Sequence, residues 1–250
     1  MRPSVLESDP HNQEIGRRWL KNAEAEHASV ASFARHTLQL MSIGAPSELL
    51  AASQEAALDE IKHAKMSYGL ASAFIGSDFV PGPLDVEESL EDMDIKEIAR
   101  SLIQEGCIGE TLAAIEVHLA AKIAQDTVVK EALLEISSDE TKHAQLAWNT
   151  IYWIIEKYPN LRTFVEETFR AEIEQRLMTT SSDTQFPSPT SCVDSNVDSS
   201  FRKYGLLVKD DRAKVHNAGI QNVIAPVYRD GFKDVGLVSQ KILQLKFSNI

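Results

Sequence analysis

Hydrophobic residues in the first 158 positions recur every three or four residues, the spacing that places them on one face of an α-helix. Interruptions of this pattern divide the segment into four expected helices. These run from about residue 9 to 43, from 46 to 74, from 94 to 124 and from 127 to 158. At 1.5 Å per residue each helix is about 40 to 50 Å long. The pattern therefore predicts an all-α protein.

The expected helix ends and connections indicate how the helices are arranged. Asp9 and Pro10 fit an N-cap followed by a first-turn proline, and Asp94 with Glu97 fits a capping box. The connections are short, long and short in chain order. The long one has about 18 residues, 76 to 93, and an extended chain of that length can run along a bundle. This order predicts a four-helix bundle made of two hairpins joined by a long crossover between the second and third helices.

Composition narrows the classes of function. The 250 residues include 25 basic and 37 acidic ones, and the resulting net charge of -12 disfavours a nucleic-acid partner. The first residues lack the apolar core of a signal peptide, and no apolar run approaches the roughly 20 residues that span a bilayer. Cys107 and Cys192 are too few for a disulfide framework. We therefore expect a cytoplasmic protein without a membrane partner.

One short phrase occurs twice, as DEIKHA at residues 59–64 and as DETKHA at residues 139–144. Each contains a glutamate three residues before a histidine, a spacing at which two helical side chains point to the same side. Both pairs fall on the inward apolar stripe of their helices, and the other two helices each place one glutamate on theirs. The six residues expected at one level of the bundle are Glu26, Glu60, His63, Glu110, Glu140 and His143.

Four carboxylates buried at one level would repel one another strongly unless cations neutralise them. Two divalent ions would balance the four negative charges, and two neutral imidazoles would complete the ligand set. Carboxylates and imidazoles together suit iron or manganese. The pattern therefore predicts a dinuclear metal site inside the bundle.

The order Glu, Glu-x-x-His, Glu, Glu-x-x-His resembles the ligand pattern of the ferritin-like di-iron carboxylate superfamily over about residues 10 to 158. The resemblance implies a ferritin-like four-helix bundle that binds two iron ions, with Mn/Fe and Mn2 as alternatives. It also implies that Glu60 and Glu140 bridge the ions and that Glu26 and Glu110 bind at the outer positions.

The resemblance extends to the residues beside the ligands. It implies that Asp59 and Asp139 each receive the ring N–H of the histidine on the opposite hairpin, which would fix the histidine tautomer. Lys62 and Lys142 occupy positions where arginine is common in the family, and both are expected to face away from the inward stripe.

A third Glu-x-x-His match, Glu24 to His27, lies off the stripe. At 100° per residue, Glu24 is about 200° around the helix from Glu26. We expect this pair to lie on a solvent-exposed helix face, so it serves as an internal comparison for the two motifs on the stripe.

Small and apolar residues near the ligands are candidates for a substrate pocket. These candidates are Val30, Phe33, Cys107 and Ala114. Cys107 precedes Glu110 by one turn, where some oxygen-activating members of the family have a small residue beside the oxygen pocket. The simpler role of a small buried residue is favoured for it.

Two domains are expected. Residues 1–158 would form the bundle, and residues 159–250 a helical extension packed on it. A fifth helical pattern covers about residues 160 to 178, and a sixth begins near Asp210 and is expected to kink or stop at Pro226. Between them, the composition of residues 179–200 is that of a flexible segment.

These features favour a di-iron enzyme that uses O2 to oxidise a small organic substrate, by hydroxylation, desaturation, N-oxygenation or oxidative C–C cleavage. The extra C-terminal helices support this choice because they could enclose a substrate. An external electron donor and a monomer or homodimer fit the same interpretation. One alternative is a ferroxidase or iron-handling protein. A second is a tRNA-modifying hydroxylase, which the net charge disfavours.

Overall fold

The computed structural model describes residues 11–87, 94–183 and 195–245. Every regular element within these ranges is a helix, and they contain no β-strand. The all-α prediction is therefore confirmed. Among the described helices we find none whose length and hydropathy would let it traverse a lipid bilayer.

The chain forms two compact units, each assembled from separate stretches of sequence. The first unit comprises residues 1–93, 120–139 and 195–206, and the second comprises residues 94–119, 140–194 and 207–250. Helices α4 (Thr111–Ile123) and α5 (Thr127–Lys157) contribute to both units. Both units contain residues from before and after position 158. A separate bundle that ends at residue 158 stays a prediction, and so does the ferritin-like topology of that bundle.

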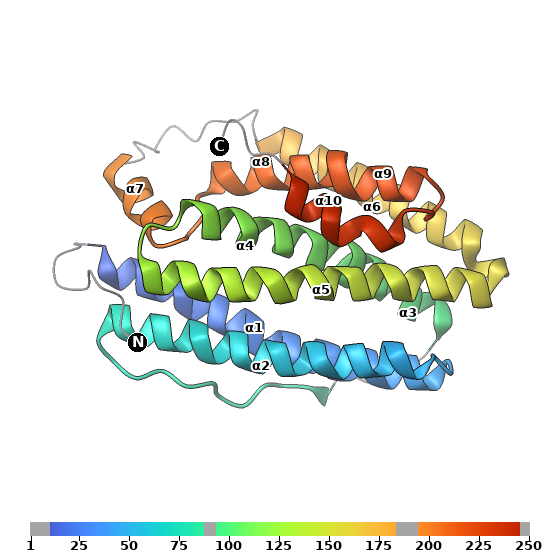
Figure 1. The fold of residues 1–250 in the computed structure, drawn as a ribbon, viewed down its shortest axis with the longest axis horizontal. Helices are drawn as coiled ribbons and strands as arrows, with labels where there is room; N and C mark the ends of the chain where they lie inside the picture. Colours follow the sequence, from blue (N-terminus) through green and yellow to red (C-terminus); the bar gives the residue numbers. More distant parts are fainter. Residues whose placement is uncertain (1–10, 88–93, 184–194, 246–250) are drawn as a thin grey trace. The chain divides into compact units, whose positions relative to one another are not determined.

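A helical hairpin forms most of the first unit. Helices α1 (Asn12–Ser42) and α2 (Ser47–Ile75) lie side by side (Figure 1). Gly44, with φ of 65°, lies in the turn between them and adopts this left-handed conformation without steric cost. Helix α1 ends one residue before its predicted limit, and α2 begins and ends one residue after its predicted limits. The predicted N-cap at Asp9 and Pro10 lies outside the described residues.

Helix α7 (Ser195–Lys203) belongs to the same unit and packs against the hairpin. The guanidinium group of Arg18 lies 3.9 Å from the ring centroid of Phe201. The rings of Phe74 and Tyr204 meet edge to face, with centroids 4.8 Å apart. Residues 195–200, the end of the segment expected to be flexible, belong to this helix. Residues 184–194 of that segment lie outside the described part of the chain.

In the second unit, the rod expected from residues 94 to 124 is present, but it is not a regular α-helix. It consists of α3 (Ile95–Ser101), the π-helix η2 (Leu102–Glu110) and α4 (Figure 1). Asp94 caps its start, because the carboxylate accepts a hydrogen bond from the Lys96 backbone N–H at 2.9 Å. The sequence pattern did not predict the π-helical segment. Such segments are rare and are often found at functional sites.

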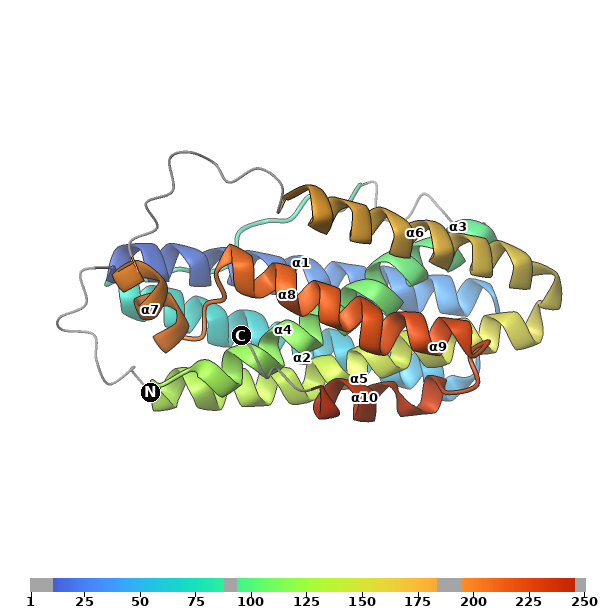
Figure 2. The same cartoon turned by 90° about the horizontal axis from the view of Figure 1, so that it is seen from above.

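The C-terminal elements of the second unit are one helix of 22 residues, α6, and several shorter ones. They are η3 (Pro159–Leu161), α6 (Arg162–Asp183), α8 (Lys209–Gly219), η4 (Ile220–Ile224), α9 (Ala225–Arg229), η5 (Val235–Leu237) and α10 (Val238–Gln244). Elements α8, η4 and α9 form one rod that continues past Pro226 (Figure 2). A π-helical turn directly precedes this proline, which has no backbone N–H to donate.

Aromatic packing joins these helices to α5 within the second unit. Trp148 of α5 stacks on Phe169 of α6 with ring centroids 5.2 Å apart, and Phe232 lies 5.4 Å from Phe169. Gln145 of α5 donates a hydrogen bond to the Val235 carbonyl oxygen at 2.6 Å. The C-terminal helices are therefore packed against the helix that carries the second Glu-x-x-His motif.

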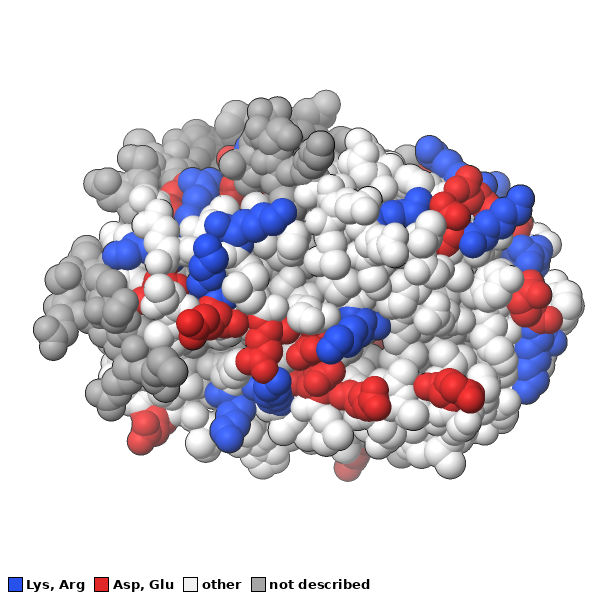
Figure 3. All heavy atoms as spheres, in the orientation of Figure 1, with Lys and Arg blue, Asp and Glu red and all other residues white. Residues whose placement is uncertain are grey.

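On the face shown in Figure 3, basic side chains lie among the acidic ones.

Candidate metal centre

Three of the predicted ligands come together in the first unit. Glu26 of α1 and Glu60 and His63 of α2 each offer one ligand atom, and these atoms lie within 4.8 Å of one another. His63 Nδ1 is 3.9 Å from Glu26 Oε2 and 3.8 Å from Glu60 Oε2. The side chains of Glu60 and His63 are almost fully buried, and that of Glu26 is 19% exposed.

The distances of 3.8 and 3.9 Å from His63 Nδ1 to the two carboxylates are too long for hydrogen bonds, since a side-chain contact of about 3.6 Å no longer counts as one. Two ligand atoms that each lie about 2.1 Å from one ion are separated by at most about 4.2 Å. The separations of 3.8 and 3.9 Å therefore suit atoms that bind the same cation.

A second contact fixes the ring of His63. Its Nε2 lies 3.4 Å from Oδ2 of Asp139, a buried residue of α5. A carboxylate only accepts hydrogen bonds, so this contact requires the ring proton on Nε2. Nδ1 then presents a lone pair toward the carboxylates of Glu26 and Glu60. Such an arrangement is repulsive by itself and is stabilised by a cation.

The other three predicted ligands come together in the second unit. One ligand atom each from Glu110, Glu140 and His143 lies within 4.8 Å of the other two. His143 Nδ1 is 3.9 Å from Glu140 Oε1, and both side chains are at least 95% buried. Glu110 is half-buried at the C-terminal end of η2. Each unit therefore supplies two glutamates and one histidine nitrogen.

The composition of the two groups fits a divalent cation. Each group contains two carboxylates, whose charge a divalent cation would balance, and one imidazole that binds in its neutral form. Neither group contains a thiolate, which structural zinc sites commonly use. A six-coordinate ion held by three protein atoms would retain positions for solvent or other small molecules.

The remaining residues of the two motifs are placed differently. Asp59 is half-buried, and its proposed contact with a histidine ring stays a prediction. Lys62 is exposed and forms an ion pair with Glu135 of α5, and this hydrogen-bonded partner raises the lysine pKa. Glu24, from the third Glu-x-x-His match, is exposed.

The pocket candidates are divided between the two units. Val30 is half-buried and Phe33 is buried on α1, whereas Cys107 and Ala114 are fully buried on the rod of the second unit. Burial raises the pKa of the Cys107 thiol well above its usual value. This cysteine is therefore a neutral, apolar side chain at pH 7, which fits the simpler role expected for it.

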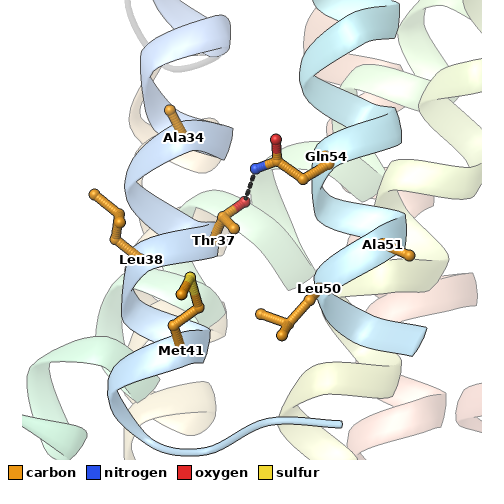
Figure 4. A pocket seen from close by; sticks show the side chains of 7 residues that line it. All are labelled: Ala34, Thr37, Leu38, Met41, Leu50, Ala51 and Gln54. Atoms are coloured by element: carbon orange, nitrogen blue, oxygen red, sulfur yellow. Dashed lines mark hydrogen bonds between the residues drawn. The ribbon is translucent and has the colours of Figure 1, made fainter. Parts of the chain in front are cut away.

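A hollow on the first unit is separate from these candidates. It has a volume of about 580 Å³ and lies between α1 and α2, near Leu38 and Met41 on one side and Leu50 on the other (Figure 4). Gln54 donates a hydrogen bond to Thr37 Oγ1 at 2.8 Å within it. Leu38 and Met41 are 44% and 60% exposed, so the hollow opens to the outside of the hairpin.

The sequence pattern did not predict the hydrogen bonds made by the residue after Glu110. Thr111, the next residue, is fully buried and contacts both Cys107 and Trp148. The one sequence signal of an irregular helix here is a pair of glycines, Gly106 and Gly109, inside an otherwise helical pattern. At Gly106, an added Cβ would lie only 2.8 Å from the Ala147 Cβ, so the glycine permits a close approach to α5.

Comparison of the chain with protein-family models, with curated proteins and with solved structures finds no match. The interpretation of this site therefore depends on the residues and their geometry.

Proposed function

We propose that the two groups bind a pair of iron ions and that the protein uses them to oxidise a small organic substrate with dioxygen. One observation carries the proposal: two buried groups have the same donor set, with a Glu-x-x-His pair that turns the histidine Nδ1 toward glutamate carboxylates. When bound, ferrous ions would supply the electrons that reduce dioxygen.

Each group would hold one of the two ions. Asp139, which contacts His63, is adjacent in sequence to Glu140 of the other group, and α5 carries both. Four carboxylates would balance the charge of two divalent ions. Glu60 and Glu140, the most buried of the four glutamates in the two groups, would hold the ions together with Glu26 and Glu110.

The chain's own residues would prepare this centre for metal. Asp139 would keep the proton of His63 on Nε2, so that Nδ1 presents its lone pair to a metal ion. Burial of Glu60, His63, Glu140 and His143 would exclude bulk water, which strengthens the attraction between carboxylates and cations. The packed C-terminal helices favour an enzyme with an organic substrate over iron storage.

Anaerobic loading of the metal-free protein with ferrous iron tests the metal assignment. We expect about two ions per chain in the unaltered protein and a loss of most bound iron in Glu60→Ala and in His143→Ala. His27→Ala is the matched control, since it removes the histidine of the third Glu-x-x-His motif. Full iron content in both ligand variants would overturn the proposal.

Exposure of the loaded protein to oxygen tests the reaction. We expect oxygen consumption that a suitable organic substrate accelerates. Oxygen consumption that instead depends on a continuous supply of ferrous iron and yields ferric mineral would indicate a ferroxidase. A loaded protein that consumes no oxygen would contradict both functions.

A further inference from the structure

The residue after Glu110 is held by two buried hydrogen bonds. Thr111 Oγ1 donates to the carbonyl oxygen of Cys107 at 2.6 Å, and it accepts the indole N–H of Trp148 at 3.0 Å. Thr111 and Trp148 are both fully buried. These bonds join the end of η2 to α5, the helix that carries Glu140 and His143.

The bond to Cys107 lies where the π-helix changes into an α-helix. In a regular α-helix, the backbone N–H of residue 111 would donate to the carbonyl of residue 107. Here that N–H donates to the Ile108 carbonyl, and the Thr111 hydroxyl donates to the Cys107 carbonyl. The side chain thus takes the place of a backbone donor at the junction.

Trp148 gives this junction a rigid support. Its ring stacks on Phe169 at a centroid distance of 5.2 Å and an interplanar angle of 20°. One residue earlier on α5, Ala147 approaches Gly106 of the π-helix so closely that no side chain fits there. The position of η2 against α5 is therefore fixed at Gly106 and at Thr111, on either side of Cys107.

We propose that Thr111 is a positioning residue, which keeps the end of η2 π-helical and thereby directs Glu110 toward Glu140 and His143. A π-helical turn holds about one residue more than an α-helical turn. If this turn became α-helical, the residues before it would rotate by about 100° about the helix axis relative to the residues after it. Glu110 lies at the last position of η2 and would be displaced from the group. This inference rests on the proposed function, because the group's role is to bind metal.

Four variants of the full-length chain test the role of Thr111. Thr111→Val keeps the shape but removes the hydroxyl, Thr111→Ser keeps the hydroxyl, and Trp148→Phe removes the indole donor. Thr150→Val is the matched control, because Thr150 on α5 is also fully buried and donates to a carbonyl four residues earlier, that of Leu146, at 2.8 Å. That bond lies within a regular α-helix.

Titration with cobalt(II), followed by visible absorption, reports ion number, affinity and ligand environment without depending on activity. We expect Thr111→Val and Trp148→Phe to weaken the binding of one of the two ions by about 10-fold or more and to change its spectrum. Thr111→Ser and Thr150→Val should bind both ions as the unaltered protein does. Thermal unfolding should show a larger loss for Thr111→Val than for Thr150→Val, because Thr111→Val also leaves the buried Trp148 N–H without its acceptor. The change in the cobalt spectrum, which reports the ligand environment, distinguishes lost positioning from reduced stability.

Wild-type affinity and spectrum in Thr111→Val would overturn the inference, as would an equal loss of binding in Thr150→Val. If Thr111→Val does not fold, the cobalt(II) affinity and spectrum of Trp148→Phe are compared with those of Thr150→Val. Equal values in these two variants would overturn the inference. An unaltered protein that binds no metal would instead overturn the proposed function, and this inference with it.

Discussion

His63 Nε2 lies 3.4 Å from Asp139 Oδ2, and both residues are buried. The contact connects the first Glu-x-x-His motif, on α2, with the residue immediately before Glu140 of the second motif, on α5. It determines which nitrogen of His63 faces the carboxylates of Glu26 and Glu60.

Asp139→Ala should weaken metal binding although Asp139 is not itself an expected ligand. Without the carboxylate, the ring of His63 can rotate and carry its proton on Nδ1, so we expect about 10- to 100-fold lower affinity for one ion. Titration with manganese(II) measures this change. Glu135→Ala is the control, since Glu135 lies one turn earlier on α5 and pairs with exposed Lys62. Equal affinities in the two variants would contradict a role for Asp139.

Glu60→Gln should weaken metal binding without lowering the stability of the metal-free protein. In the metal-free protein, Glu60 and Glu26 both place a carboxylate oxygen within 3.9 Å of His63 Nδ1, and the substitution removes one of the two negative charges. We expect the free energy of unfolding without metal to stay equal or to rise by about 1 kcal/mol. The unaltered protein should gain about 2.7 kcal/mol at a metal concentration 100 times its Kd, a gain the variant should lack. Thermal unfolding with and without manganese(II) checks both expectations, and a metal-dependent gain of the same size in Glu60→Gln would refute them.

Two serines on α2 should respond differently to truncation. Ser53 and Ser67 are both fully buried. Ser53 Oγ lies 2.9 Å from Thr37 Oγ1 and 3.3 Å from the Phe33 carbonyl oxygen, whereas Ser67 Oγ has no hydrogen-bond partner among the residues that the structure describes. Ser53→Ala should therefore cost about 1 to 2 kcal/mol, and Ser67→Ala should be neutral or stabilising.

Urea unfolding of the two serine variants in metal-free protein measures this difference. The substitutions remove the same atom from the same helix, so each is the control for the other. A loss of stability in Ser67→Ala as large as that in Ser53→Ala would show that the Ser67 hydroxyl has a partner in solution.

His36 should make the protein less stable in mild acid. Burial, and to a smaller extent the positive charge of nearby Arg35, together lower its pKa from 6.5 to about 4. The unfolded chain therefore takes up a proton at a higher pH than the folded chain does. This contribution to stability is fully present above pH 6.5 and is lost as the pH falls toward 4.

His36→Gln should remove part of that pH dependence, by about 1 to 2 kcal/mol between pH 7 and pH 4.5. Urea unfolding at a series of pH values measures it. His27→Gln makes the same substitution on the same helix and is measured beside it. An unchanged slope in His36→Gln would mean that His36 titrates normally in the folded protein.

Periodicity in the sequence predicted the long helices, and it singled out the acids and histidines that lie close together within each unit. Helical periodicity determines the side to which Glu60 and His63 point, and the cost of burying charge makes their position on an apolar stripe informative. The same reasoning separates them from Glu24, which is exposed.

The π-helix and α7 could not be predicted in this way, because contacts distant in sequence determine them. Trp148 supports the end of η2 from a different helix, and local propensity around Gly106 and Gly109 indicates only a weak α-helix. Helix α7 has nine residues, too few to be stable alone. Its Phe201 and the residue that follows the helix, Tyr204, pack against the hairpin.

The division of each unit among distant stretches of sequence affects how the chain folds during synthesis. The first unit needs residues up to 206, so its hairpin leaves the ribosome long before α7 can cover Phe74. A growing chain therefore exposes apolar surface until late in translation, which favours aggregation or chaperone binding. A fragment that ends at residue 158 would retain this exposure permanently.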